Sequence, residues 1–123
     1  MIAIRNDGDT SIGSVAIRRG IRDSFERLLW WLFAASAGAS TRNLVLSSIR
    51  ENPRNAQQLS HDLKLDYSTV RHHLRVLETN NLVVAEGEKY GRMYFVSETM
   101  ESRWDKLETI NKSKAVSKGR AGR

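Results

Sequence analysis

Apolar residues recur at helical spacing over much of the chain after residue 22, and this spacing predicts a series of amphipathic helices. The first begins at Asp23, because Asp23 and Glu26 form the pattern of a capping box. The second starts at Ser40 or Thr41, either of which can cap it, and runs to about Glu51, shortly before a proline. The residues of this second helix that we expect to face the core are Val45, Leu46 and Ile49.

Two further helices are expected, joined by a turn of only a few residues. The third opens at Asn55, with Gln58 at the capping-box position. The fourth covers Asp66–Asn80, and Asp66 is its expected N-cap because a carboxylate can accept the first unpaired backbone N–H groups. Its apolar residues recur at i, i+4 and i+7 and should be buried: Val70, Leu74 and Leu77. Its opposite side carries polar residues: Ser68, Arg71, His72 and Arg75, with Thr69 near the border. This is the pattern of a helix-turn-helix.

The apolar period then falls to two, which is typical of strands. Residues 82–86 and 92–96 are predicted to form two strands, with a turn at 87–91 between them. A hairpin directly after a helix of this kind is a wing, whose tip can reach DNA phosphates or the minor groove. Lys89 and Arg92 lie at or beside the tip, and we expect both to contact DNA. The alternative is a plain edge hairpin with solvated charges, because two glutamates lie nearby.

A last helix is predicted after Ser97, which can cap it, and it should end near Asn111. Its apolar stripe consists of Met100, Trp104, Leu107 and Ile110. This stripe needs a surface to cover, either on its own chain or on a second subunit. Residues 1–22 show no sustained pattern and are expected to form a loosely ordered leader, residues 23–111 the folded domain, and residues 112–123 a flexible basic tail.

The first helix is apolar almost all round, because Trp30 and Trp31 add to the stripe that one core would cover. One interpretation is a membrane or secretion signal, since basic residues precede the apolar run and Ala35-Ser36-Ala37 resembles a cleavage site. The run, however, is about a dozen residues where a membrane span needs roughly 20. Acidic residues before it are also wrong for a signal. We favour a helix that packs on its own domain and on a second subunit.

The expected fold class is therefore mainly α with a small antiparallel β-hairpin: a winged helix-turn-helix with flanking N- and C-terminal dimerisation helices. The expected interface of the homodimer lies on the first and last helices, at Leu29, Trp30, Phe33, Met100, Trp104, Leu107 and Ile110.

Composition and charge narrow the class of partner. A chain of 123 residues fits one domain, and the absence of Cys excludes disulfides and thiolate metal sites. The absence of Cys also suits a reducing cytoplasm, where we expect the protein to act without a membrane partner. The formal net charge of +6 favours an acidic partner such as nucleic acid. Five of the 20 basic residues lie in 112–123, which leaves 15 against 14 acidic residues elsewhere. Non-specific attraction should therefore come mainly from the tail.

The polar side of the fourth helix suits the edges and phosphates of a DNA major groove. Arg can pair bidentately with guanine, and Ser and Thr suit several bases. We expect Arg71 to read bases with Ser68 and His72, because it lies nearer the N-terminus that enters the groove deepest in helix-turn-helix proteins. We expect Arg75 to hold a phosphate. The alternative for this helix alone is an ordinary amphipathic helix with a solvated polar face.

The order of elements resembles a known family. The run Ser68–Glu78, with Asn81–Val83 after it, closely resembles the recognition helix of winged-helix regulators of the arsenic-repressor (ArsR) type. Asn55–Leu59 and Gly87–Phe95 look like archaeal members of that group. The resemblance covers roughly residues 24–110. It implies a homodimer that binds a pseudo-palindromic operator in double-stranded DNA, usually as a repressor. It also implies which residues face the groove: Ser68, Thr69, Arg71, His72 and Arg75.

The chain departs from that family in its metal chemistry. Founding members sense metals through Cys on the equivalent helix, and this sequence has none. His72 and His73 are adjacent, so they point about 100° apart around a helix and cannot chelate one ion together. His61 lies on another helix without an assignable carboxylate partner. We expect no metal and no cofactor, and the sequence identifies no small-molecule effector.

Three classes of function are alternatives to a sequence-specific regulator of DNA. Catalysis is disfavoured, because the sequence has no phosphate-cradling glycine loop and no nucleophile–base set whose proximity it supports. A sequence-indifferent architectural protein that binds DNA or RNA is the main alternative to a sequence-specific regulator. A winged helix used only for protein–protein contact is the other, although such a helix would more often expose aromatic residues or Met than arginines.

Overall fold

The computed structural model describes residues 23–121, so the expected leader at 1–22 lies outside the described residues. The elements follow in this order: α2 (Ser24–Trp30), η1 (Trp31–Ala35), α3 (Ala39–Glu51), α4 (Ala56–Leu63), α5 (Tyr67–Thr79), β1 (Val83–Glu86), η2 (Lys89–Gly91), β2 (Met93–Val96), α6 (Glu98–Ser102) and α7 (Trp104–Ala121). The predicted fold class, mainly α with one antiparallel hairpin in a winged helix-turn-helix, is confirmed.

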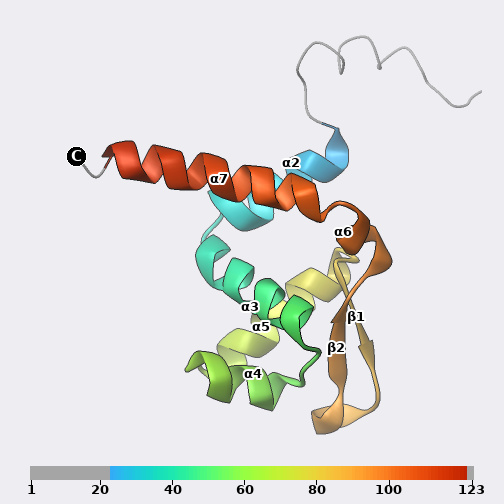
Figure 1. The fold of residues 1–123 in the computed structure, drawn as a ribbon. Coiled ribbons are helices and arrows are strands. Elements are labelled where there is room, and N and C mark those ends of the chain that lie inside the picture. Colours follow the sequence, from blue (N-terminus) through green and yellow to red (C-terminus); the bar gives the residue numbers. More distant parts are fainter. Residues whose placement is uncertain (1–22, 122–123) are drawn as a thin grey trace, which may run out of the picture.

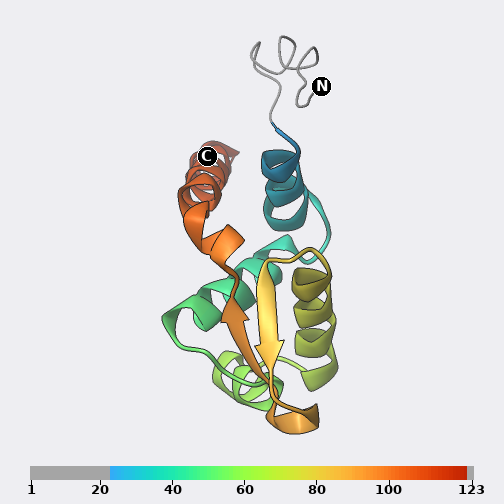
Figure 2. The same ribbon diagram turned by 90° about the vertical axis from the view of Figure 1, so that its right-hand side faces the viewer.

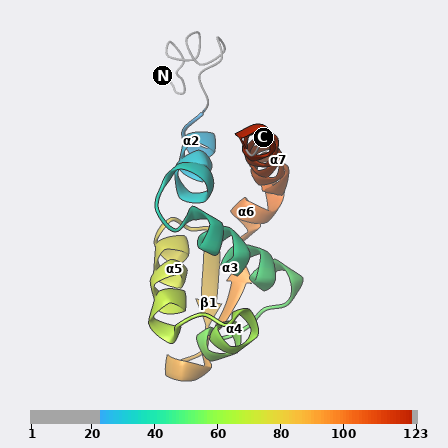
Figure 3. The ribbon, with the colours of Figure 1, turned by 90° about the vertical axis from the view of Figure 1, so that its left-hand side faces the viewer.

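Different helices and strands form the two ends of the molecule. Helices α2 and α7 lie beside each other at one end, while α4 and the tip of the hairpin form the other end (Figure 1). Between them α5 packs beside β1 and α3 beside β2, as Figures 2 and 3 show from opposite sides. The strands pair antiparallel from Val83 opposite Val96 to Glu86 opposite Met93. The backbone N–H of Tyr94 also donates to the carbonyl of Arg54, at 3.0 Å, which adds the segment before α4 to the sheet.

One continuous core joins both ends. Its buried side chains come from every helix of the winged domain and from the hairpin, and the largest fully buried ones include Phe33, Leu46, Leu59, Leu74 and Met100. Val45, Leu46 and Ile49 of α3 are buried, as the spacing predicts. Val70, Leu74 and Leu77 of α5 are buried as well. These positions fix which side of α5 remains free to meet a partner.

Three predicted helix caps are present. The Asp23 carboxylate accepts the backbone N–H of Glu26 at 2.8 Å. Asn55 and Gln58 form a reciprocal capping box, with bonds of 2.8 and 2.9 Å, which satisfies two otherwise unpaired N–H groups at the start of α4. The Ser97 hydroxyl accepts the N–H of Met100 at 3.1 Å. Local side-chain chemistry therefore sets the start of α2, α4 and α6.

Other helix boundaries differ from the prediction. Helix α3 begins at Ala39, directly after Gly38 with a φ of 81°, so Ser40 and Thr41 lie inside it and do not cap it. Asp66 occupies the N-cap position of α5, but its side chain makes no capping hydrogen bond. The last helix is interrupted at Arg103, where φ is −121° and ψ is 21°.

Helix α7 continues past Asn111, where we expected it to end, to Ala121. The ammonium group of Lys114 donates to the carbonyl of Phe33 at 2.8 Å, so the first part of the expected tail is anchored to η1. Alanine and lysine in this part of the chain are also good helix formers. The flexibility of the rest of the tail stays a prediction.

The first and last helices pack on each other within the chain. Lys106 on α7 pairs with Glu26 on α2 at 2.9 Å, and Asn111 exchanges amide hydrogen bonds with Asn43 on α3. Five of the seven predicted interface residues are buried within the chain: Leu29, Phe33, Met100, Leu107 and Ile110. Trp30 and Trp104 are partly buried, and Trp31 is 58% exposed. Among these three residues, Trp31 of the first helical segment therefore has the most exposed apolar surface, and the interface itself stays a prediction.

No helix in residues 23–121 combines the length and the apolar character that a bilayer crossing requires.

Candidate nucleic-acid interface

The turn between α4 and α5 holds the two helices in a fixed relation. Lys64 adopts a left-handed conformation with φ 57°, which ends α4. The Ser60 hydroxyl donates to the carbonyl of Leu65 at 2.6 Å, and the N–H of Leu65 returns to the carbonyl of Ser60 at 3.0 Å. This reciprocal pair closes the turn. The helix-turn-helix expected from the sequence is present.

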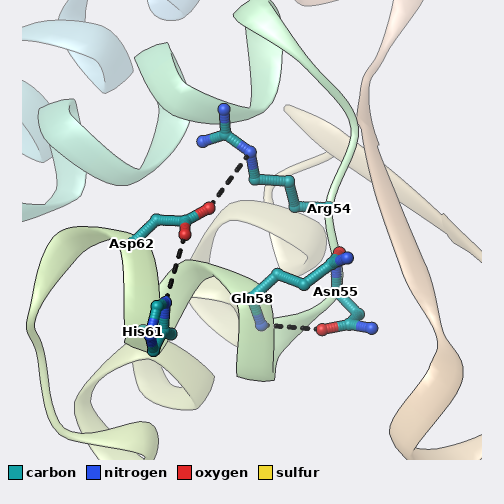
Figure 4. Close-up of polar contacts among 5 residues, drawn as sticks. All are labelled: Arg54, Asn55, Gln58, His61 and Asp62. Atoms are coloured by element: carbon teal, nitrogen blue, oxygen red, sulfur yellow. Dashed lines mark hydrogen bonds and ion pairs between the residues drawn. The ribbon is translucent and has the colours of Figure 1, made fainter.

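Helix α4 is attached to the segment before it by a small polar network (Figure 4). Arg54 lies 3.6 Å from the carboxylate of Asp62, which also approaches Nδ1 of His61 at 3.4 Å. The side chains of Asn55 and Gln58 lie beside this network. Because Arg54 also bonds to β2 through its carbonyl, the network ties α4 to the wing. His61 is 90% exposed, and it has a carboxylate neighbour that the sequence did not assign.

The exposed side of α5 carries the predicted groove-facing residues. Ser68, Arg71, His72 and Arg75 are exposed, and Thr69 is partly buried. They do not all face the same way. Turning 100° per residue, Ser68, His72 and Arg75 lie opposite the buried stripe, while Arg71 lies on the flank shared with Tyr67 and Glu78. That flank faces the wing, because Glu78 pairs with a wing residue.

Arg92 and Lys89 occupy different positions on the wing. The guanidinium of Arg92 lies 3.3 Å from the carboxylate of Glu78, so Arg92 ties the wing to α5. Lys89 is exposed at the start of η2, in a left-handed conformation with φ 52°. Of the two predicted wing contacts, Lys89 is therefore at the tip and Arg92 is between the tip and α5.

A cleft of about 340 Å³ lies between α5 and the wing. The described residues that line it are Ala56, Tyr67, Arg71, Lys89, Arg92 and Tyr94. Inside it, the guanidinium of Arg71 donates to the Tyr67 hydroxyl at 3.3 Å and lies 5.8 Å from the centre of that ring. The structure thus brings Arg71, Lys89 and Arg92 together and leaves Ser68, His72 and Arg75 on the open face.

Two buried polar residues behind α5 were missed by the sequence analysis. His73 is 5% exposed and Arg42 is 4% exposed. Burial, then the charges of Arg42 and His72, lower the pKa of His73. The sequence could have predicted the burial of His73, because residue 73 is the i+3 position of the i, i+3, i+4, i+7 series that begins at Val70. Within the described residues, Nδ1 of His73 and Nε of Arg42 have no hydrogen-bond partner.

Arg42 is held by groups of the π-helix η1 and of the turn after it. In η1 the N–H of Ser36 reaches back five residues to the carbonyl of Trp31, at 2.9 Å. Nη1 of Arg42 donates a hydrogen bond to the Leu32 carbonyl at 2.7 Å and another to the Ser36 hydroxyl at 3.0 Å. Arg42 thereby joins η1 to α3, and its charge lies next to the buried side of the recognition helix.

Across the part of the chain that the structure describes, no group of three or more His, Asp or Glu residues is placed to hold a metal ion. The rings of His72 and His73 meet edge to face, with centroids 5.1 Å apart, but one ring is exposed and the other buried.

Residues 39–84 match the family model "Bacterial regulatory protein, arsR family", which confirms the resemblance to the ArsR type, while the likeness to archaeal members stays a prediction. This segment runs from α3 into β1 and contains both helices of the helix-turn-helix. A search of curated proteins finds no match.

Solved structures share the fold. Reduced HlyU from Vibrio cholerae aligns with a TM-score of 0.54 and 21% identity, over 76% of this chain and 90% of that one. A second structure of HlyU from Vibrio cholerae aligns with a TM-score of 0.51 and 24% identity, over 73% of this chain and 89% of that one. A third structure is the homodimeric winged helix-turn-helix DNA-binding domain of Mb0332 from Mycobacterium bovis, a possible ArsR-family transcriptional regulator. It aligns with a TM-score of 0.50 and 16% sequence identity, over 91% of this chain and 91% of that one. These likenesses support the winged helix-turn-helix fold.

Proposed function

We propose that this chain is a DNA-binding transcriptional regulator that acts as a homodimer, recognises a specific operator and represses transcription there. The observation that carries the proposal is the exposed side of α5. It presents Ser68, His72 and Arg75 outward while Val70, Leu74 and Leu77 anchor the helix to the core. A rigid helix with a hydroxyl, an imidazole and a guanidinium on one side offers the donors and acceptors that read base edges in a major groove.

The charge distribution of the wing supports the same placement. Arg71 on α5 and Lys89 and Arg92 on the wing gather at one end of the molecule, while α2 and α7 occupy the other (Figure 1). Cations beside a reading helix position a protein on the phosphate backbone without specifying sequence. The match to the arsR family model over residues 39–84 supports the role of a regulator, and the resemblance to that family supports repression.

The homodimer rests on two observations. The Mb0332 domain, which shares the fold, is homodimeric. Trp31 is 58% exposed on η1, next to the paired first and last helices. An exposed indole of this kind is typical of a protein–protein interface. Two copies joined there would present two recognition helices, as a two-fold-related operator requires.

The test is a titration of the full chain against the DNA upstream of its own coding sequence and against a scrambled duplex, at several salt concentrations. We expect operator binding to exceed scrambled binding at every salt concentration, and Arg75→Ala to reduce that ratio. Arg27→Ala is the matched control, because Arg27 is an exposed arginine on α2 at the other end of the molecule. It removes the same charge and should leave the ratio unchanged.

Two results would contradict the proposal. Equal affinity for both duplexes, with a steep salt dependence, would indicate a sequence-indifferent architectural protein. No binding to either duplex by a protein that melts normally would favour a winged helix that contacts other proteins.

A further inference from the structure

The cleft between α5 and the wing has the composition of an anion site. Of the described residues that line it, Arg71, Lys89 and Arg92 are cations and none is acidic. Two of the cations come from separate elements, Arg71 from the recognition helix and Lys89 from η2, and Arg92 lies between η2 and β2. Like charges gathered around one space repel one another, so the arrangement favours an anion between them.

Tyr67 adds a directed hydrogen bond to this charge. Its hydroxyl oxygen accepts a hydrogen bond from Nη1 of Arg71, at 3.3 Å. A phenol that accepts one bond still has its own proton to donate. The Tyr67 hydroxyl and the cations beside it therefore offer several donors to one group of oxygens. Arg92 is already fixed by Glu78, at 3.3 Å, which holds the wing side of the cleft in place.

The position of the cleft indicates which anion it receives. If α5 lies in a major groove and the hairpin tip approaches the neighbouring minor groove, one DNA strand has to pass between them. Its phosphates are the anions that reach the cleft. A phosphate also has the several acceptor oxygens that this set of donors requires.

We propose that this cleft is a phosphoryl-binding site that holds one backbone phosphate of each half-site, with Tyr67, Arg71, Lys89 and Arg92 as its donors. The proposal rests on the proposed function. It assigns Tyr67 a direct contact that the sequence analysis did not foresee. It also assigns Arg71 to the DNA backbone, which leaves Arg75 as the arginine of α5 placed to read bases.

The experiment is a scan of operator duplexes that each carry one neutral methylphosphonate in place of a phosphate. Each duplex is titrated with the full wild-type chain and with Tyr67→Phe, which removes only the hydroxyl. We expect one phosphate position per half-site at which neutralisation weakens wild-type binding about tenfold, as the loss of a hydrogen bond to a charged group does. On the duplex neutralised at that position, Tyr67→Phe should reduce the affinity little further, because the hydrogen bond between the Tyr67 hydroxyl and the charged phosphate is already absent.

A matched pair of lysines separates contact in the cleft from total charge. Lys89 and Lys64 are both exposed and both have a positive φ, of 52° and 57°. Lys89→Gln should couple to the same phosphate position as Tyr67→Phe. Lys64→Gln removes the same charge outside the cleft and should show no coupling to that position. If the loss from Tyr67→Phe is equal on every duplex, the cleft does not hold a backbone phosphate.

A separate arm tests a free phosphate as the ligand. Inorganic phosphate is titrated against the protein–operator complex, with chloride holding ionic strength constant. Release of DNA by phosphate alone, together with a scan that shows no coupled position, would overturn the backbone assignment in favour of a small phosphate-bearing ligand. Failure of the proposed function is distinct, because wild-type protein would then show no preference for operator over scrambled DNA.

Discussion

Gly38 and His73 lie so close that a Cβ on Gly38 would be 2.9 Å from Cε1 of His73. Gly38 is the residue before α3, and His73 is on the buried side of the recognition helix. The contact therefore joins the turn after η1 to the helix that we propose reads DNA. Arg42 also lies beside this contact, because its Nη2 atom is 3.6 Å from the same Cβ position on Gly38.

Gly38→Ala should destabilise the fold by about 1–3 kcal/mol, because Gly38 has a φ of 81° and the added methyl group has no room beside the imidazole. Urea denaturation of the two proteins measures the difference. Gly91→Ala is the control, since among the described residues no atom other than those of Gly91 and its chain neighbours lies within 4 Å of a Cβ there, and it should change stability by less than about 0.5 kcal/mol. Equal effects of the two substitutions would mean that Gly38 and His73 are not in close contact.

The stability of the protein should fall as pH falls through 6.5. Burial, Arg42 and His72 hold the pKa of His73 below its ordinary value of 6.5. Below pH 6.5 the unfolded chain takes up a proton that the folded chain refuses, so unfolding becomes easier until the folded pKa is reached. The loss is at most about 1.4 kcal/mol per pH unit.

Urea denaturation between pH 7.5 and 5 measures this loss. His73→Gln should reduce the pH dependence, because it removes the buried imidazole. An unchanged slope in His73→Gln would exclude His73 as its source.

The sequence predicted those parts of the fold that depend on local chemistry. The apolar series Val70, Leu74 and Leu77 is buried, and the reciprocal bonds of Asn55 and Gln58 begin α4. Side-chain period and capping act over a few residues, so both can be inferred without knowing what the helix packs against.

The parts that depend on tertiary contacts could not be inferred in this way. Arg42 is buried and donates to the carbonyl of Leu32 in η1, a π-helix that the apolar pattern does not predict. Helical spacing places Arg71 nearer the flank of α5 than Arg75, but it cannot show that the wing lies beside that flank, which carries Tyr67 and Glu78. Helical spacing predicts which residues share one side of a helix, but it does not predict which other element packs against that side.

If the chain is the homodimer that we propose, Trp31→Glu should give folded monomers, because a carboxylate would replace a large exposed apolar side chain beside the first and last helices. Light scattering gives the mass of each protein in solution. Substitution at Leu107 is unsuitable, since this side chain is 1% exposed and a charge there would unfold the chain. Val84→Glu is the control, at a 46% exposed apolar residue of the hairpin, and should remain dimeric. A dimeric Trp31→Glu protein would place the interface elsewhere.

The basic end of the chain should supply affinity without specificity. Lys114 donates to the carbonyl of Phe33, so deleting residues 112–123 would also remove a structural contact. We therefore neutralise four other cations of this segment, with Lys112→Gln, Lys118→Gln, Arg120→Gln and Arg123→Gln. The slope of log affinity against log salt should fall by up to about 3.6 units per chain, at roughly 0.9 per phosphate contact. The ratio of operator to scrambled binding should stay constant, and a large fall in that ratio would mean that the segment reads sequence.

The two arginines of α5 should have separable effects on DNA recognition. Arg75 lies opposite the buried stripe, so Arg75→Ala should cost about 1–3 kcal/mol on the operator and relax the preference at one base pair per half-site. Arg71 lines the cleft beside the wing, so Arg71→Ala should weaken operator and scrambled DNA about equally and lower the salt slope by roughly one unit per contact.

A panel of single-base operator variants measures the preference of each protein, and thermal melts confirm that both remain folded. Both positions are exposed on a helix, where alanine is well tolerated, so neither change should lower the melting temperature appreciably. A loss of base preference in Arg71→Ala but not in Arg75→Ala would restore the assignment drawn from the sequence alone, in which Arg71 reads bases. In that case Arg71 would have to leave the flank beside Tyr67 when DNA binds.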